Sequence, residues 1–258
     1  MRERNPDHVV GCGQRRAHGM LRSMMTTTIK RALLRTACIA ALVSGCAPAG
    51  RAGDAAAGND NAQSLRVMTY NIHAGTGGLD RIADVIRVQQ PDIVGLQEVD
   101  VHFSARSDFV DQASTLAESL GMEMRFAHIY ELAPETAGAP PREYGVALLS
   151  RHPITAFHNH LMPRLSTVED EPEPRPRPGF LEATVQIGDV AVRVFNTHLD
   201  YRGDPRVRRM QVAETLRIIG ATSAPTVLMG DLNAEPDAAE LQPLLQRLRD
   251  AWTTQTTA

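Results

Sequence analysis

The 258-residue sequence contains three cysteines and one lysine, and all of them lie in the first 46 residues. From residue 47 onward the chain therefore has no means of forming a disulfide bond, even in a compartment that permits one. This later part carries 19 arginines and 28 acidic residues, a net charge of −9. Such acidity excludes the broadly basic surface of a nonspecific nucleic-acid binder. It leaves open a local basic patch around Arg206, Arg208 and Arg209.

The N-terminal part is typical of an exported protein. Residues 1–24 contain arginine and glycine without a periodic apolar pattern, and we expect them to be upstream sequence translated before the true initiator, Met24 or Met25. Residues 25–46 combine a basic flank with an apolar run from 32 to 43. That run is too short to cross a bilayer but suits a signal peptide.

The apolar run ends in Leu-Val-Ser-Gly-Cys at residues 42–46, which resembles the bacterial lipobox and predicts acylation of Cys46. A buried helix that happens to end in cysteine is the alternative. Residues 47–64 are rich in Ala, Gly, Asn and Asp and predict a flexible linker. We therefore expect a lipoprotein anchored in the bacterial cell envelope, facing the extracytoplasmic side, with one domain at residues 65–258.

Five segments of this domain place polar residues at the end of apolar, often β-branched runs, as strands that deliver side chains to a site would. They read Thr-Tyr-Asn-Ile-His at 69–73, Gly-Leu-Gln-Glu-Val at 95–99, Tyr-Gly-Val-Ala-Leu-Leu-Ser-Arg at 144–151, Asn-Thr-His-Leu-Asp at 196–200 and Gly-Asp-Leu-Asn at 230–233. If the chain stays extended, Asp231 and Asn233 leave on one face. They would suit a hard cation, a polarised water or a phosphate oxygen. An Asx turn that caps the next helix is the alternative, and Gly230 is expected to end the strand.

The first part of the domain predicts a strand at residues 65–70, an amphipathic helix from Leu79 to a stop at Pro91, and a strand at 92–97. This unit would bring Asn71 and Glu98 to neighbouring strand ends. Further elements are expected as a helix at 110–120, a strand at 122–129, a hairpin about Gly188-Asp189 and a final helix at 237–248.

Two regions carry more specific predictions. The segment from 163 to 179 is rich in proline and glutamate, and we expect an exposed excursion without regular structure. After it, Asp204 is expected to cap a helix that begins with proline. The residues predicted to face the core from this helix are Val207, Met210, Ala213 and Leu216.

Taken in order, the five segments resemble the endonuclease/exonuclease/phosphatase family, the deoxyribonuclease I-like metal-dependent phosphoesterases, across about residues 65–252. The resemblance implies an α/β fold, a four-layer sandwich of two packed mixed β-sheets flanked by helices, here lacking the last strands. It also implies an enzyme that hydrolyses phosphate esters with Mg²⁺ or Mn²⁺. No clustered His or Cys residues occur at zinc spacing, so zinc is not expected.

The resemblance also implies residue roles. Glu98 would be the direct metal ligand, with Asn71 close to the metal and the phosphate. Asp231 and Asn233 would orient the attacking water. His198 would donate a proton to a phosphoryl or leaving-group oxygen, as a histidine beside carboxylates can when it is protonated near neutrality.

Each of the two residues predicted at the rim of the site has two interpretations. Tyr144 would lie by the substrate phosphate in the resembling family, but from its own surroundings it is equally an aromatic lid over a strand edge. His73 would line the rim of the site, or it is an ordinary loop histidine. Both are therefore candidate substrate-binding residues.

The sequence departs from the family in one respect. Family members continue for some tens of residues to a closing Ser-Asp-His segment, whose histidine is expected to activate the water, and no histidine follows His198 here. We therefore expect a truncated product of impaired activity. The rival interpretation is a non-catalytic surface lipoprotein that binds a partner or a phosphorylated ligand. Among enzymes, the calcineurin-like phosphoesterases fit less well, because their Gly-Asn-His and Asp-x-His ligand pairs are absent. We expect the substrate to be a lipid or a small phosphodiester rather than a nucleic acid. We expect the protein to be a monomer.

Overall fold

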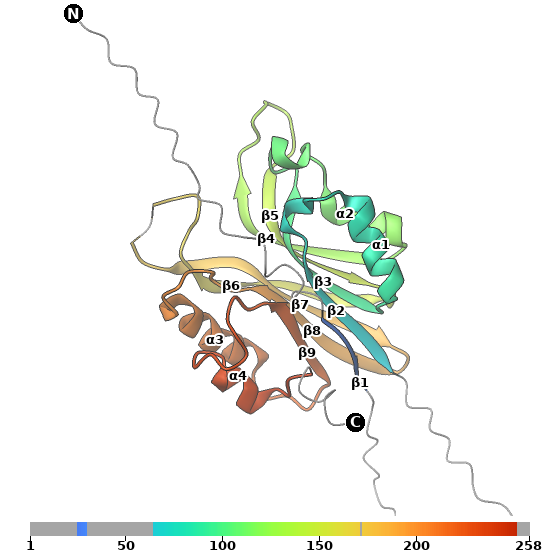
Figure 1. Cartoon of the computed structure of the whole chain (residues 1–258), viewed down its shortest axis with the longest axis vertical. Helices are drawn as coiled ribbons and strands as arrows, with labels where there is room; N and C mark the ends of the chain where they lie inside the picture. The colour runs from blue at the N-terminus through green and yellow to red at the C-terminus, as the bar shows by residue number, and fades with distance from the viewer. Residues whose placement is uncertain (1–24, 30–63, 171, 252–258) are drawn as a thin grey trace, which may run out of the picture.

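The computed structural model describes residues 25–29, 64–170 and 172–251, which form two β-sheets with helices on their outer sides (Figure 1). The first sheet has the order β1-β2-β3-β5-β4, with bounds Met25–Ile29, Leu65–Asn71, Ile93–Val101, Arg142–Ser150 and Glu123–Leu132. The second has the order β6-β7-β8-β9, with bounds Ile154–Arg164, Arg175–Ile187, Val190–His198 and Thr226–Asp231. The helices are α1 Leu79–Gln89, α2 Gln112–Leu120, α3 Arg206–Ile219 and α4 Gln242–Arg247, with short 3-10 turns η1 His73–Gly75 and η2 Ala105–Ser107.

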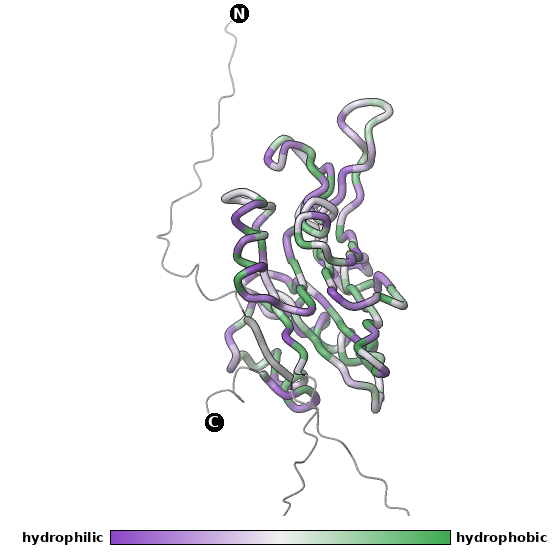
Figure 2. The backbone as a smooth tube through the Cα atoms, turned by 90° about the vertical axis from the view of Figure 1, so that its right-hand side faces the viewer, coloured by the Kyte–Doolittle hydropathy of each residue, from purple (hydrophilic) through white to green (hydrophobic). Residues whose placement is uncertain are grey.

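Apolar side chains hold these elements together in layers. Residues of both sheets, such as Leu148 on β5 and Val194 on β8, form one core between the sheets. A second core lies between the first sheet and helices α1 and α2, and a third between the second sheet and helices α3 and α4. Figure 2 shows the hydrophobic stretches running along the strands in the middle of the molecule. The predicted four-layer α/β sandwich with two mixed sheets is confirmed.

Two parallel strand pairs bring the polar strand ends together. β2 runs parallel to β3 with Asn71 opposite Gln97, and β8 runs parallel to β9 with His198 opposite Asp231. The other strand pairs of the described residues are antiparallel. Because parallel strands end at the same edge of a sheet, each pair delivers its polar residues side by side. Asn71 and Glu98 meet as predicted, but only Asn71 is at a strand end, because β3 continues past Glu98 to Val101.

The prediction of an irregular excursion from 163 to 179 is wrong for part of that segment. β7 begins at Arg175 and includes Pro176 and Pro178, and it pairs with β6 through Met162 and Arg177. Its other neighbour, β8, pairs with β7 only from Leu181 onward. Alternate residues of a strand direct their backbone nitrogens to the same edge, so both prolines can direct theirs away from β6. In this outer part of β7 they therefore do not interrupt the pairing with β6.

Helix α3 buries a different face from the predicted one. Val207 is buried as expected, but Met210 is 41% exposed and Ala213 is also exposed, whereas Arg208 and Gln211 are buried. These two polar side chains hold the loop that follows β8. The Arg208 guanidinium donates to the carbonyl of Asp200 at 3.0 Å, and the Gln211 amide oxygen accepts from the backbone N–H of that residue at 2.9 Å.

Most of the N-terminal predictions lie outside the described residues, namely those for 1–24, Cys46 and the linker up to residue 63. Strand β1 falls within the segment predicted as a signal peptide and pairs antiparallel with β2, Met25 opposite Thr69. The signal-peptide and lipidation assignments stay predictions. In the described part of the chain, no helix has the length and apolarity needed to cross a bilayer.

Candidate active site

One asparagine joins the two sheets at the edge where the polar strand ends meet. The Asn71 Nδ2 group, at the end of β2, donates to Glu98 Oε1 at 2.7 Å and to Asp231 Oδ2 at 2.9 Å. Glu98 belongs to the first sheet and Asp231 to the second. Two carboxylates separated by 133 positions in the sequence therefore converge on one amide, in a partly exposed position.

A β-bulge in β3 directs Glu98 into this site. β3 pairs with β5 at Leu96 and Ala147 and next at Val99 and Gly145, so β3 holds one extra residue between the two pairs. Glu98 lies in this bulge with a φ of 55°, a left-handed conformation that is unusual for a residue with a Cβ. Bulges re-aim side chains and are frequent beside active sites. The conformational strain is the kind that concentrates at functional positions.

Strand β9 brings Asp231 close to the first sheet by packing tightly on β8. Gly230 lies within β9 rather than ending it, with a φ of 150°, and a Cβ there would lie 2.2 Å from the Thr197 carbonyl oxygen. The glycine is thus required for the close approach of the two strands. The Asp231 oxygens have separate partners, since Oδ1 accepts from the Asn233 N–H at 3.0 Å and Oδ2 from Asn71.

The structure corrects the expected placement of Asn233. Its φ is 48°, so the chain does not stay extended after Asp231, and the predicted common face is not formed. The bond from the Asn233 N–H to Asp231 is an Asx turn, but helix α4 begins only at Gln242, so the turn does not cap it. The Asn233 Nδ2 group instead donates to the Leu199 carbonyl at 2.9 Å. Asn233 therefore ties the β9 exit to the residue after His198.

His198 lies beside Asp231, with 3.9 Å between His198 Nε2 and Asp231 Oδ2 and a side chain only 14% exposed. Burial, the largest influence, lowers the pKa of the imidazole, and it outweighs the attraction of the Asp231 and Glu98 carboxylates. The expectation of a protonated His198 near neutrality therefore does not follow from this environment. A neutral imidazole still has one ring N–H to donate, and 3.9 Å is too long for a hydrogen bond to Asp231.

The two rim candidates, His73 and Tyr144, have different surroundings. The His73 Nδ1 atom is 3.2 Å from Glu98 Oε2, and its side chain is 66% exposed, which places it at the rim. The Tyr144 ring stacks with Tyr130 at a centroid distance of 6.2 Å. Burial, followed by the Glu98 charge, raises the pKa of the Tyr144 phenol, so it remains protonated. Tyr144 thus has an aromatic packing role and is also electrostatically coupled to Glu98.

Two buried polar residues behind the site received no role from the sequence, although Asn196 begins one of the five segments. The Arg164 guanidinium donates to the carbonyls of His198 at 2.9 Å, Gly179 at 2.9 Å and Pro178 at 3.0 Å. Burial lowers the pKa of Arg164 to about 10, so the group keeps its charge at neutral pH. Asn196 donates to carbonyls of β3 and β5 at 2.9 Å each. An arginine beside a proline in the supposed excursion and an asparagine inside an apolar strand were the available signals.

The donor set at this site suits a hard divalent cation. The carboxylates of Glu98 and Asp231 offer oxygen ligands of the kind that Mg²⁺ and Mn²⁺ prefer. Asn71 donates to both through Nδ2 while its Oδ1 accepts from the His73 N–H at 3.0 Å, so the amide positions the two carboxylates. The two carboxylates share the Asn71 amide donor, Asp231 also accepts from the Asn233 N–H, and Glu98 Oε2 lies 3.2 Å from His73 Nδ1. None of these partners is an arginine or a lysine, so a cation would add the charge that the site has little of. The residues present therefore fit the metal that the sequence predicted.

A sequence model of the Endonuclease/Exonuclease/phosphatase family matches residues 68–258. The chain belongs to this family. Its members are hydrolases that act on phosphate esters and commonly use divalent metals. The suspected family resemblance is therefore confirmed, and it accounts for the polar strand ends that meet at Asn71.

Individual relatives extend the comparison. An endonuclease/exonuclease/phosphatase from Beutenbergia cavernae DSM 12333 is 29% identical, with a TM-score of 0.52 over 68% of this chain and 50% of that protein. A family protein from Leptotrichia buccalis C-1013-b is 19% identical, with a TM-score of 0.52 over 71% of this chain and 72% of that one, and shows the shared fold. Protein cwh43 of Schizosaccharomyces pombe is 27% identical over 62% of this chain but only 15% of its own length. The chain thus spans a small part of cwh43 and half of the Beutenbergia protein.

Proposed function

We propose that this chain is a Mg²⁺- or Mn²⁺-dependent phosphoesterase that hydrolyses phosphate esters by attack of water. The observation that carries the proposal is the Asn71 amide, which donates at 2.7 and 2.9 Å to carboxylates from both sheets. An amide with a purely structural role would not need two carboxylates as acceptors. Holding two negative charges close together on a partly exposed edge is unfavourable. A site that accepts a cation gives these charges a use.

The side chains divide the chemistry among them. Glu98 would be the direct ligand of the cation, and Asn71 would lie close to it and hold the Glu98 and Asp231 carboxylates in place. The cation would supply a Lewis acid that neutralises phosphoryl oxygens. Asp231 Oδ2 accepts hydrogen bonds and would orient the attacking water, while its Oδ1 is engaged in the Asx turn. His198, neutral because of its burial, would donate its Nε2–H to a phosphoryl or leaving-group oxygen. Asn233 would act by holding Leu199 and with it the position of the His198 backbone.

For the substrate, we infer a lipid or small phosphodiester rather than a nucleic acid. The net charge of −9 after residue 46 would repel a polyanion, and two of the three arginines in the candidate basic patch are paired with acids. Arg206 pairs with Glu173 at 3.1 Å, and Arg208 is buried against Glu240 at 2.8 Å. The patch that the sequence left open around these arginines is thus partly neutralised.

The activity can be tested with bis-p-nitrophenyl phosphate and Mn²⁺, and with p-nitrophenyl phosphate to separate diesterase from monoesterase action. Asp231→Asn is expected to lower turnover by about 10²–10⁴-fold, because the water loses its charged acceptor. Asp189→Asn, in the exposed turn between β7 and β8, is the matched control and should not change turnover. Mn²⁺-dependent turnover that is equal in wild type and Asp231→Asn would contradict the proposal. Phosphate binding without any turnover would favour the non-catalytic surface protein instead.

We further propose that Cys46 carries a lipid anchor and that the domain faces the extracytoplasmic side of the bacterial envelope. The support is the basic flank, the apolar run and the Leu-Val-Ser-Gly-Cys sequence at residues 42–46. Cys46→Ala is expected to move the protein out of the membrane fraction or to leave it unprocessed. The measurement is fractionation with mass spectrometry of the mature N-terminus, and Cys38→Ala serves as the control. An unchanged, cleaved and membrane-bound Cys46→Ala protein would refute the anchor.

A further inference from the structure

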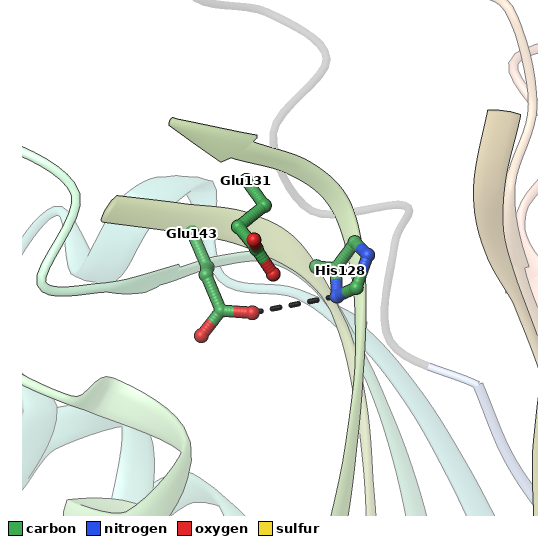
Figure 3. A group of neighbouring side chains, drawn as sticks. All are labelled: His128, Glu131 and Glu143. Carbon is green, nitrogen blue, oxygen red and sulfur yellow. Dashed lines mark ion pairs between the residues drawn. The ribbon is translucent and has the colours of Figure 1, made fainter. Parts of the chain in front are cut away.

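A group of three potential metal ligands lies on strands β4 and β5, apart from the site around Asn71. His128 and Glu131 belong to β4 and Glu143 to β5, and one ligand atom from each lies within 4.8 Å of the others. His128 Nδ1 is 3.4 Å from Glu143 Oε1. Figure 3 shows the Glu131 carboxylate directed into the space beside this pair. An imidazole that faces two carboxylates distinguishes the group from an ordinary acidic patch.

A second β-bulge creates this arrangement. Residues three apart on a regular strand face opposite sides, so His128 and Glu131 would not meet. β4 pairs with β5 at His128 and Gly145 and next at Tyr130 and Tyr144, which leaves one extra residue, Ile129, on β4. Ile129 and Tyr130 consequently both pack into the core between the sheets. His128 and Glu131 are thereby turned together to the outer face of the first sheet.

The two carboxylates of the group are unfavourably placed without a cation. Glu131 and Glu143 are directly opposite each other in the β4–β5 register, and like charges so placed destabilise a sheet. A bound cation would remove this repulsion.

We propose that His128, Glu131 and Glu143 form a second cation site, which takes a divalent transition metal such as Zn²⁺. One imidazole nitrogen and two carboxylate oxygens are a three-ligand set that zinc accepts with a water as fourth ligand. Mg²⁺ favours oxygen ligands alone, so the imidazole directs selectivity toward zinc. Zinc was not expected from sequence spacing, because these ligands meet across strands. Since Glu143 precedes Tyr144, bound metal would fasten β4 to β5 next to the tyrosine beside Glu98.

The test is a calorimetric titration with Zn²⁺ alone, on the full chain carrying Glu98→Gln so that the Asn71 site does not contribute. Adding Glu131→Gln or Glu143→Gln is expected to weaken zinc binding at least about tenfold. Adding Glu118→Gln, an exposed acid on α2, should leave the affinity unchanged. Every variant carries the same three cysteines, so zinc bound by thiols cancels in the comparison.

Two further measurements make the outcome decisive. Co²⁺ in place of zinc should give visible absorption bands that His128→Asn removes and His158→Asn, on β6, does not. Glu131 is exposed and its replacement removes a repulsion, so this variant is expected to fold, which circular dichroism would verify. Equal zinc affinity in the Glu131→Gln and Glu118→Gln proteins would overturn the proposal. Because no substrate is involved, this result would leave the proposed phosphoesterase activity untouched.

Discussion

Glu98→Gln is expected to reduce phosphoesterase turnover by about 10²–10⁴-fold and to weaken Mn²⁺ or Mg²⁺ binding. The substitution removes the negative charge but keeps the size and one acceptor oxygen. That oxygen can still accept from Asn71 Nδ2, which now donates at 2.7 Å to Glu98 Oε1. The left-handed backbone at this position is unchanged by the substitution. The stability of the metal-free protein should therefore barely change, so a loss of function would not reflect unfolding.

The measurement for Glu98→Gln is calorimetric titration with Mn²⁺, accompanied by thermal unfolding without metal. It is best made in Glu131→Gln protein, because the second site proposed above would otherwise add its own binding heat. Glu118→Gln, which removes the same charge from an exposed position on α2, is the matched control. If Mn²⁺ binds equally to both proteins, Glu98 is a surface acid and not a metal ligand.

Arg164→Met is expected to destabilise the fold and to raise the pKa of His198. Three carbonyls that now accept from Arg164 at 2.9–3.0 Å would lose a buried donor, at a cost of about 1–3 kcal/mol for each unsatisfied group. One of these carbonyls is that of His198, so the imidazole would also lose its backbone anchor. The nearby positive charge of Arg164 contributes to the low pKa of His198, and its removal must therefore raise that pKa.

The decisive readout for Arg164 is the titration of the His198 ring by NMR, with the resonance assigned from a His198→Asn protein. Arg164→Lys is the matched variant, since it keeps the charge but does not have the fork of donors that spans three carbonyls. It should retain a low His198 pKa and still lose activity, by about 10²-fold if the imidazole is displaced by an ångström. A lower unfolding temperature in Arg164→Met with an unchanged His198 pKa would restrict Arg164 to a structural role.

Local sequence patterns were sufficient for several elements, among them β2, α1, α2 and the β7–β8 hairpin, but not for β1, β6 or the start of β7. Period-two apolar runs and the helical spacing after Leu79 depend on neighbours within one segment, and the structure confirms them. The parallel pairing of β2 with β3 follows from the strand–helix–strand connection. For these reasons the sequence alone brought Asn71 and Glu98 together, although it ended the strand before Glu98, which lies within β3.

The tertiary structure alone decided those features that depend on pairing between segments distant in the sequence. The two bulges beside the pairs of Gly145 turn Glu98 into one site and His128 toward Glu131 in the other. A bulge is defined by the partner strand and not by the residues that form it. The prolines of β7 are tolerated because β8 does not extend beside them. Arg164 reaches His198 only through the folded second sheet. Each of these contacts joins residues that no periodic pattern connects, so the sequence supplied the functional groups and the packing of strands decided where they point.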